Sequence, residues 1–302
     1  MSELALRIIF AVVAAPIALW VVLVGGLPLA ILLAIVCGLG AWEFYRIARA
    51  AGARPMDDIG IALAAAAPLA LHAHYLGVVS LRPAVLAVLC VIILGAAIWL
   101  RGVEGAPLAA VSTTIFGIIY TAGLLGFGYA IRYHDSVAGY DSVGARHLAL
   151  GSFDLAIPPG GVLLMMPLLI TWASDIGAYA VGRTIGGRKL IPSVSPGKTV
   201  SGAVGGLVAS MLVSLLLART VLAPVAHLGF TPWGALFFGA VVSVAAQTGD
   251  LFESLLKRES GVKDSSRIIP GHGGILDRFD SLIFVLPVSY MLLSWLPIPV
   301  FR

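Results

Sequence analysis

The stretch PAVLAVLCVIILGAAIWL, residues 83–100, decides the class of fold. It carries no charged side chain, and its length is close to the roughly 20 mostly apolar residues that a helix needs to cross the hydrocarbon of a bilayer. The whole chain shares this bias, because 60% of its 302 residues are hydrophobic and 11% are charged, whereas soluble domains are about 25% charged. With a mean hydropathy of +1.02, the composition excludes a disordered chain, a disulfide-bonded secreted scaffold and an ordinary soluble enzyme.

Apolar runs of similar length recur on both sides of this stretch. Together they predict an all-α, polytopic integral membrane protein with about nine transmembrane helices, roughly eight to ten. We expect the first run to be a retained span and not a signal peptide, because it is long and further spans follow at once. The candidate spans are 7–25, 27–46, 58–79, 83–100, 107–132, 161–182, 202–220, 232–254 and 276–299.

The basic residues indicate how these spans are oriented. Of the 19 Lys and Arg residues, 14 lie at the N-terminus or after even-numbered spans, and such an excess marks the cytoplasmic loops. The N-terminus is therefore predicted to be cytoplasmic. The 15 arginines against 4 lysines are typical of a GC-rich bacterial genome, so we expect a multi-pass protein of the cell inner membrane whose active site faces the cytoplasm. Because the charges are spread over short loops, no nucleic-acid partner is expected.

Along the sequence we distinguish three segments. Residues 1–132 are predicted to form N-terminal transmembrane helices (about five spans), 133–160 an extracytoplasmic loop, and 161–302 C-terminal transmembrane helices (about four spans) that carry the catalytic site. In the first segment, Glu43 lies near a cytoplasmic helix end with Arg46, and an interfacial ion pair between them is expected. Cys37 and Cys90 both lie in apolar runs, so neither a disulfide framework nor a cysteine zinc site is expected.

The stretch 250–280 differs from the rest of the chain in its charge. It holds 11 of the 34 charged residues, several of them inside or at the edge of apolar spans. An ionisable group at the centre of a bilayer costs about 2.5–3.5 kcal/mol. Asp250, Glu253, Asp277 and Asp280 therefore require partners, water or a metal ion, and we expect the chemistry of the protein to lie here.

The spacing of these residues predicts two polar helix faces. Asp250, Glu253, Ser254 and Lys257 have the i, i+3, i+4, i+7 spacing that places side chains on one face of a helix, and Asp277 and Asp280 open the next span with spacing i, i+3. Carboxylates that face Lys and Arg side chains are typical of a site for Mg²⁺ and phosphate, because Mg²⁺ prefers hard oxygen ligands and the cations bind phosphate oxygens.

The loop between the two faces, KRESGVKDSSRIIPGHGG (257–274), is rich in cations and glycine. Gly271, Gly273 and Gly274 would let backbone N–H groups approach an anion closely. The alternative is a set of salt bridges that only closes two helix ends, and this alternative leaves the glycines and His272 unexplained.

A second polar cluster precedes this region. Asp175 lies near the cytoplasmic end of the span at 161–182, and the loop SVSPGKT (193–199) follows it. Its GKT resembles the end of a P-loop, but Pro192 stands where that pattern needs glycine and no strand precedes it, so it is not a Walker motif. Ser195, Lys198 and Thr199 are candidates to contact a phosphate or a nucleotide, and a plain basic loop at the membrane surface is the alternative.

The stretch SLLKRESGVKDSSRIIPGHGGILDRFD (254–280) resembles the signature of the phosphatidate cytidylyltransferases, also called CDP-diacylglycerol synthases. That signature reads S-x-x-K-R-x4-K-D-x-small-x2-apolar-P/G-x-H-G-G-x2-D-R-x-D, and every specified position is met. The segments SDIGAYAVGR (174–183) and SPGKT (195–199) are also similar to the family. One departure is Ser201, which stands where the family commonly has Glu, so no role is carried over to it. The resemblance covers 174–281, about a third of the chain.

The resemblance implies a reaction and the residues that perform it. CTP and phosphatidic acid would give CDP-diacylglycerol and pyrophosphate at the bilayer, with Mg²⁺ as cofactor; a second cation and a homodimer are both compatible with this interpretation. The residues implied as catalytic are Asp277, Asp250, Lys257 and Arg278; those implied in metal binding are Asp250, Asp277, Asp280 and Asp175; those implied in substrate binding are Ser195, Lys198, Arg258, Lys263, His272, Gly273 and Gly274.

Other classes of function are weighed against this one. A membrane transporter with a charged cavity open to the cytoplasm also has intramembrane carboxylates, but the chain shows no internal repeat and its charges cluster at one face. CDP-alcohol phosphotransferases carry a D-G-x2-A-R…G-x3-D-x3-D pattern that is absent here. A cytidylyltransferase that acts on another lipid phosphate stays open.

Overall fold

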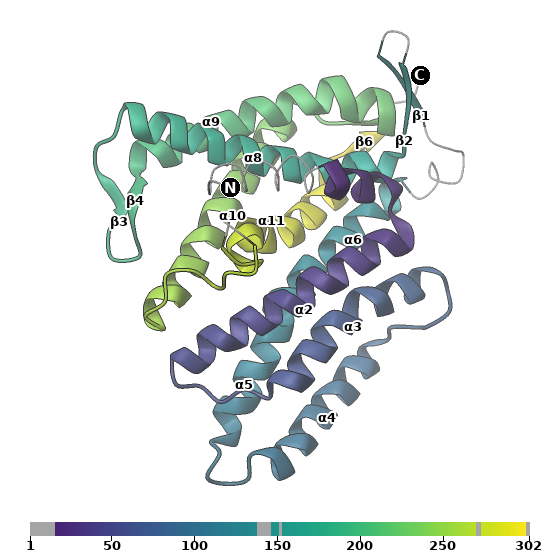
Figure 1. Ribbon diagram of the computed structural model, residues 1–302. Coiled ribbons are helices and arrows are strands. Elements are labelled where there is room, and N and C mark those ends of the chain that lie inside the picture. Colours follow the sequence, from purple (N-terminus) through teal and green to yellow (C-terminus); the bar gives the residue numbers. More distant parts are fainter. Residues whose placement is uncertain (1–15, 138–145, 151–152, 270–272, 300–302) are drawn as a thin grey trace, which may run out of the picture. The chain divides into compact units, whose positions relative to one another are not determined.

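The computed structural model describes residues 16–137, 146–150, 153–269 and 273–299. They form a predominantly helical protein, which confirms the predicted all-α class (Figure 1). The described residues belong to two compact units. Unit 1 holds 26–129, 255–269 and 273–279, and unit 2 holds 16–25, 130–137, 146–150, 153–254 and 280–299. Three of the helices given below, α6, α10 and α11, contribute residues to both units.

Unit 1 is built from the N-terminal helices. These are α2 (Gly26–Ala50), α3 (Asp57–Tyr75), α4 (Pro83–Leu100), α5 (Pro107–Ile118), the π-helical segment η1 (Ile119–Gly123) and the beginning of α6 (Phe127–Arg132). Tyr45 of α2 is fully buried and its hydroxyl donates a hydrogen bond to the Thr114 carbonyl of α5 at 2.7 Å. A Cβ at Gly60 or Gly117 would collide with the Tyr45 ring, so these glycines let α3 and α5 pack closely on α2.

Unit 2 is built around three long helices. They are α8 (Pro159–Thr184), α9 (Val200–Leu217) with the π-helical continuation η2 (Ala218–Ala226), and α10 (Pro232–Glu259), to which α11 (Leu276–Trp295) is added. A Cβ at Gly177 of α8 would lie 2.6 Å from the Ala209 side chain of α9, and such small residues allow membrane helices to approach each other. Buried serines link the helices: Ser174 and Ser243 share a hydrogen bond of 2.8 Å between α8 and α10.

Six helical segments in the described part of the chain are long and apolar enough to cross a membrane. They are Gly26–Ala50, Pro83–Leu100, Pro107–Val137, Pro159–Thr184, Val200–Ala226 and Pro232–Glu259. The protein is therefore a membrane protein with several candidate spans, as predicted. The predicted spans 58–79 and 276–299 are occupied by α3 and α11, which are not among these six, and the predicted span 7–25 lies largely outside the described residues. The number of nine spans stays a prediction.

Three short antiparallel strand pairs, of which the first two are hairpins, interrupt the helices and were not predicted from the sequence. The first pairs β1 (Arg146–Leu150) with β2 (Phe153–Ile157), the second pairs β3 (Lys189–Ile191) with β4 (Ser195–Thr199), and the third pairs β5 (Leu228–Gly229) with β6 (Ile298–Pro299). The second hairpin carries the SPGKT segment between α8 and α9, so a loop predicted from its composition is in fact a strand pair.

Candidate active site

The first group of predicted site residues lines a cavity in unit 2. The cavity encloses about 540 Å³, and Asp175 of α8, Lys198 of β4 and Asp250 of α10 all line it. Three elements that are far apart in the sequence thus place two carboxylates and an ammonium group around one space. The other lining residues are Ala178, Tyr179, Gly182, Arg183, Leu190, Gly197, Thr199, Gly202, Ala203 and Gln247.

The second hairpin presents Lys198 to this cavity. Thr199, the next residue, caps the N-terminus of α9, and its Oγ1 accepts a hydrogen bond from the Gly202 N–H at 3.1 Å. A Cβ at Gly202 would lie 2.8 Å from the Ala178 carbonyl oxygen of α8. The cap and the close approach of the two helices hold the end of β4 against α8, and Lys198 is thereby fixed at the cavity wall.

An ion pair joins Lys198 to Asp250. The Lys198 Nζ lies 2.6 Å from the Asp250 Oδ2, and the two side chains are 27% and 36% exposed. An ion pair with this much access to water contributes about 0–1 kcal/mol, so the two groups can separate at little cost. Lys198 can therefore bind another anion in place of Asp250, and Asp250 can bind another cation in place of Lys198.

The donor set of this cavity fits Mg²⁺ carried by a nucleotide. Asp175 and Asp250 offer two carboxylates, and Mg²⁺ usually takes one or two carboxylates and leaves its other positions to water and substrate phosphates. Among the described residues, no group of three or more His, Cys, Asp or Glu side chains is arranged to hold a metal ion. The residues therefore suit a shared site and not a closed all-protein cage.

The helices α10 and α11 adjoin within unit 2, directly beside Asp250. A Cβ at Gly249 would collide with the Asp280 carbonyl oxygen, and the rings of Phe252 and Phe284 lie 5.8 Å apart. Gly249 thus lets the two helix backbones touch. The Asp280 carboxylate accepts a hydrogen bond from the Ser281 N–H at 2.6 Å.

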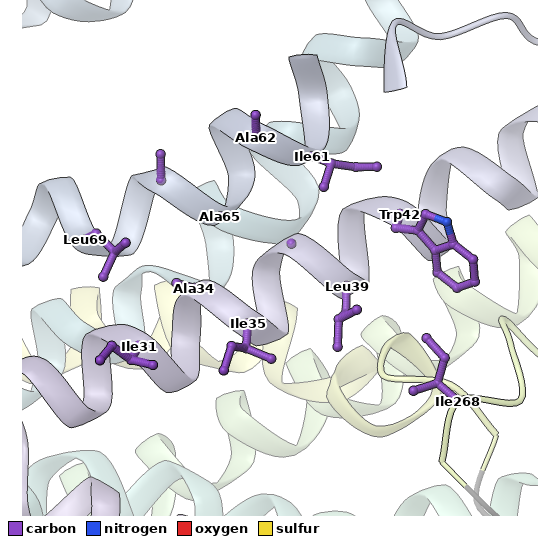
Figure 2. A pocket seen from close by; sticks show the side chains of 12 residues that line it. Ile31, Ala34, Ile35, Leu39, Trp42, Ile61, Ala62, Ala65, Leu69 and Ile268 are labelled. Carbon is purple, nitrogen blue, oxygen red and sulfur yellow. The ribbon is translucent and has the colours of Figure 1, made fainter. Parts of the chain in front are cut away.

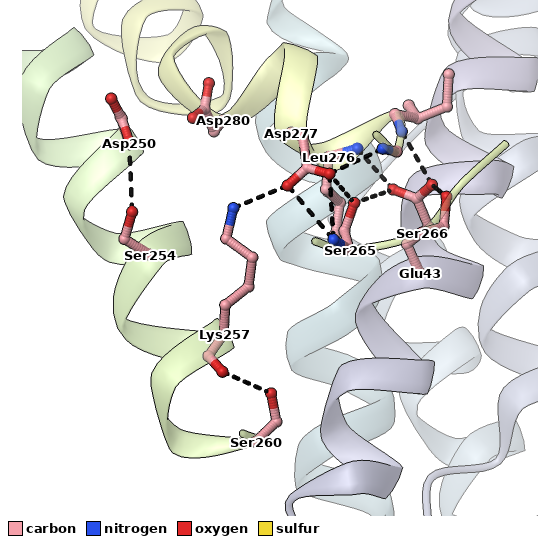
Figure 3. A network of polar contacts seen from close by, with 12 residues as sticks. Glu43, Asp250, Ser254, Lys257, Ser260, Ser265, Ser266, Leu276, Asp277 and Asp280 are labelled. Atoms are coloured by element: carbon pink, nitrogen blue, oxygen red, sulfur yellow. Dashed lines mark hydrogen bonds and ion pairs between the residues drawn. The ribbon is translucent and has the colours of Figure 1, made fainter. Parts of the chain in front are cut away.

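The second group of predicted site residues forms a network in unit 1, and Asp277 is at its centre (Figure 3). Its Oδ1 lies 2.8 Å from the Lys257 Nζ, and both side chains are mostly buried, at 9% and 14% exposed. The Asp277 carboxylate also accepts hydrogen bonds from the Ser265 hydroxyl at 3.0 Å and from the Gly274 N–H at 2.8 Å. Asp277 therefore holds Lys257 and two points of the signature loop at once.

Gly273 and Gly274 are required by this network. Gly273 has φ +85°, and a Cβ there would lie 2.6 Å from the Asp277 Oδ2; a Cβ at Gly274 would collide with Ser265 and Glu43. Only glycine fits this backbone without strain. The sequence analysis predicted that these glycines would allow N–H groups to approach an anion, and in the structure the anion that Gly274 approaches is the Asp277 carboxylate.

Glu43 of α2 is a site residue that the sequence analysis missed. It is fully buried, and its carboxylate accepts four hydrogen bonds: from the hydroxyls of Ser265 and Ser266, at 2.9 and 2.5 Å, and from the N–H groups of Ile275 and Leu276, at 2.9 and 2.7 Å. Leu276 is the first residue of α11 and Ile275 directly precedes it, so Glu43 caps that helix from a distant part of the chain. The sequence had predicted an ion pair between Glu43 and Arg46. The sequence feature that could have indicated the observed role is the position of an acid within an apolar span, because a carboxylate there requires buried hydrogen-bond donors.

The remaining predicted residues lie around these two groups. Arg258 on α10, Lys263 in the following loop and Arg278 on α11 are exposed. Ser195 pairs with Ile191 at the far end of the second hairpin and is not among the residues that line the cavity. His272 lies outside the described residues.

The chain was compared with known proteins. A model of the cytidylyltransferase family matches residues 5–296. The phosphatidate cytidylyltransferase of Staphylococcus saprophyticus is 48% identical over 130 residues, which cover 43% of this chain and 48% of that protein. The phosphatidate cytidylyltransferase of Brucella suis is 37% identical over 183 residues, 58% of this chain and 66% of that protein. The chain thus spans about half the length of the first of these relatives and just under two thirds of the second.

Proposed function

The chain belongs to the cytidylyltransferase family, and we propose that it transfers CMP from CTP to phosphatidic acid, which gives CDP-diacylglycerol and pyrophosphate. The observation that carries this proposal is the cavity in which Lys198 lies between the carboxylates of the family-like segments, with Asp250 at 2.6 Å. The similar proteins reported above are named phosphatidate cytidylyltransferases. We place the site at the cytoplasmic face of the membrane, where CTP and a lipid headgroup can meet.

The proposed step is a nucleotidyl transfer. A phosphate oxygen of the lipid forms a bond to the α-phosphorus of CTP, the bond from that phosphorus to the bridging oxygen breaks, and pyrophosphate leaves with the electron pair. A phosphomonoester is already largely ionised near neutral pH, so the nucleophile needs little help from a base. The task of the protein is to bring two polyanions together and to stabilise the charge of the leaving group.

Two carboxylates, each paired with a lysine, would perform this task. Asp175 and Asp250 would hold Mg²⁺, which when bound neutralises phosphate charge and polarises the α-phosphorus. Lys198 would then leave Asp250 and bind a phosphate oxygen of CTP. The second carboxylate, Asp277, forms its ion pair with Lys257, and this pair is mostly buried. This proposal also includes the other roles that the resemblance implies. Asp277 and Asp280 would take part in metal binding. The residues that would contact phosphate are Lys257, Arg258, Lys263, His272, Arg278 and Ser195.

One assay tests the function directly. The purified protein, in detergent or in vesicles, is given CTP labelled at the α-phosphate together with a panel of lipid phosphates, with and without Mg²⁺. We expect label to enter CDP-diacylglycerol with phosphatidic acid, EDTA to stop the reaction and added Mg²⁺ to restore it. Label that appears only with a different lipid phosphate would identify another cytidylyltransferase, and transport of an unmodified substrate into vesicles without label transfer would contradict the proposal.

Replacing Lys198 by alanine is expected to raise KM for CTP about 10- to 100-fold, because a hydrogen bond to a charged group contributes about 1.5–3 kcal/mol. Steady-state kinetics with both substrates measures the effect. The matched control is Lys189→Ala, which removes an exposed lysine from the paired strand of the same hairpin. Unchanged KM values for CTP and lipid in Lys198→Ala would refute the phosphate role of this lysine.

A further inference from the structure

An apolar groove runs along one side of unit 1, between α2 and α3 (Figure 2). It has a volume of about 900 Å³. Gly38, Ala62, Ala65 and Ala66 contribute only small side chains to it, and a Cβ at Gly38 would lie 3.1 Å from that of Ala65. Larger side chains of α2 form a wall, in which Ile31 and Ile35 are 45% and 54% exposed. The small residues thus make a long hollow that the described residues leave open.

The length of this groove matches one leaflet of a bilayer. From Ile31 to Trp42, which both line it, α2 rises about 16 Å at 1.5 Å per residue. Half of a hydrocarbon core of about 30 Å is about 15 Å. Because α2 is long and apolar enough to span the membrane, a groove of this length along it fits hydrocarbon of about acyl-chain length. A packed helix from another chain would instead follow the full thickness of the membrane.

The Trp42 end of the groove adjoins the signature loop and has the Arg46 guanidinium beside it. Ile268, a residue of that loop, lines the groove at this end (Figure 2). The guanidinium of Arg46 lies over the Trp42 ring, 5.6 Å from its centroid, and Arg46 and Arg267 are both exposed. Tryptophan favours the membrane–water interface, and arginine favours phosphate. This end therefore suits the headgroup of an anionic lipid whose chain lies in the groove.

We propose that the α2–α3 groove binds an acyl chain of the lipid phosphate substrate in the cytoplasmic leaflet and directs its phosphate toward the signature loop. This proposal rests on the proposed function, because it names the site of the lipid in that reaction. The adjacent residue, Glu43, holds the same loop through Ser265 and Ser266, so the wall of the groove and the loop are parts of one rigid arrangement. The groove would select for a long apolar chain, and Arg46 at its Trp42 end would select for the phosphate of the headgroup.

The test uses Ala66→Phe, which places a large side chain in the groove. The matched control is Ala87→Phe, the same change at an exposed alanine of α4 that does not line the groove. In phosphatidylcholine vesicles, phosphatidic acid with a photoreactive group near the end of one acyl chain is expected to label α2 and α3. Ala66→Phe should reduce this labelling at least about fivefold and raise KM for long-chain phosphatidic acid about tenfold (about 1.4 kcal/mol), with kcat and KM for CTP unchanged.

The other outcomes overturn the proposal. Labelling that avoids the groove, or a KM that Ala66→Phe leaves unchanged, would exclude it as the chain site. If a diacylglycerol probe, which lacks the phosphate, labels the groove as strongly as the phosphatidic acid probe does, the groove holds ordinary bilayer lipid. Disulfide-linked dimers of Ala66→Cys would show that a second copy of the chain covers the groove. Wild-type protein that is labelled in the groove but transfers no CMP would refute the proposed function while supporting an anionic-lipid groove, so the two failures are distinguishable.

Discussion

Replacing Asp277 by asparagine is expected to lower kcat/KM for CDP-diacylglycerol formation at least about 1000-fold, which corresponds to about 4 kcal/mol of transition-state stabilisation. The physical reason is that the Asp277 carboxylate lies 2.8 Å from the Nζ of the mostly buried Lys257 and also holds Ser265 and Gly274. Breaking one side of a buried ion pair costs about 3–5 kcal/mol. The measurement is steady-state turnover with labelled CTP, together with the thermal unfolding midpoint in detergent.

Two further variants separate chemistry from folding. Asp58→Asn changes an exposed aspartate in the first turn of α3 and is the matched control, for which we expect activity within about twofold, because surface substitutions usually cost less than about 0.5 kcal/mol. The double variant Asp277→Asn with Lys257→Met also removes the ammonium group that Asp277 contacts, so it should recover thermal stability but not activity. Full activity in Asp277→Asn, or recovery of activity in the double variant, would contradict a catalytic role.

Replacing Glu43 by glutamine should lower kcat/KM about 100-fold or more, although the two side chains have nearly the same shape. Each carboxylate oxygen accepts one backbone N–H, from Ile275 and from Leu276. A glutamine has one oxygen and one NH₂ group, so in either orientation it turns a donor toward one of these N–H groups. An unsatisfied buried donor costs about 1–3 kcal/mol, and here the cost falls on the loop and the first turn of α11, directly before Asp277.

The control for this variant is Glu104→Gln, which changes an exposed glutamate between α4 and α5. Turnover is measured well below the unfolding temperature of each variant, so that a loss of folded protein does not mimic a loss of activity. A double-mutant cycle of Glu43→Gln with Ser265→Ala tests the coupling. Additive effects on activity, or wild-type activity in Glu43→Gln, would show that Glu43 does not position the signature loop.

Much of the fold could be predicted from the sequence because it depends on local composition. The apolar runs at 83–100 and 161–182 correspond to α4 and α8, since a helix is the simplest way to satisfy every backbone group in lipid. The charged stretch 250–280 could also be recognised from the sequence, because ionisable groups inside or at the edge of a bilayer are costly unless they have partners or a function. The hairpin that carries Lys198 could not be predicted, because its strands are too short to show an alternation of apolar and polar residues.

The sequence predicted which residues belong to the candidate site, but it did not predict which of them form ion pairs with one another. The sequence singled out Asp250 and Asp277 as acids that need compensation, but two charges far apart in the chain do not say which cation each will meet. The structure pairs Asp250 with Lys198 and Asp277 with Lys257. The first pair needs the hairpin and the second needs the turn at Gly273 and Gly274, and both depend on backbone geometry that side-chain spacing does not report.

The amino-acid sequence alone determined that this chain is a helical membrane protein of the cytidylyltransferase type, because hydropathy and the signature at 254–280 are properties of residues read in order. Only the tertiary structure decided the role of Glu43, which lies more than 200 positions before Ser265 in the sequence. Its four hydrogen bonds form only when α2 packs beside the signature loop. A buried acid takes the nearest donors in space, and that proximity is created by folding.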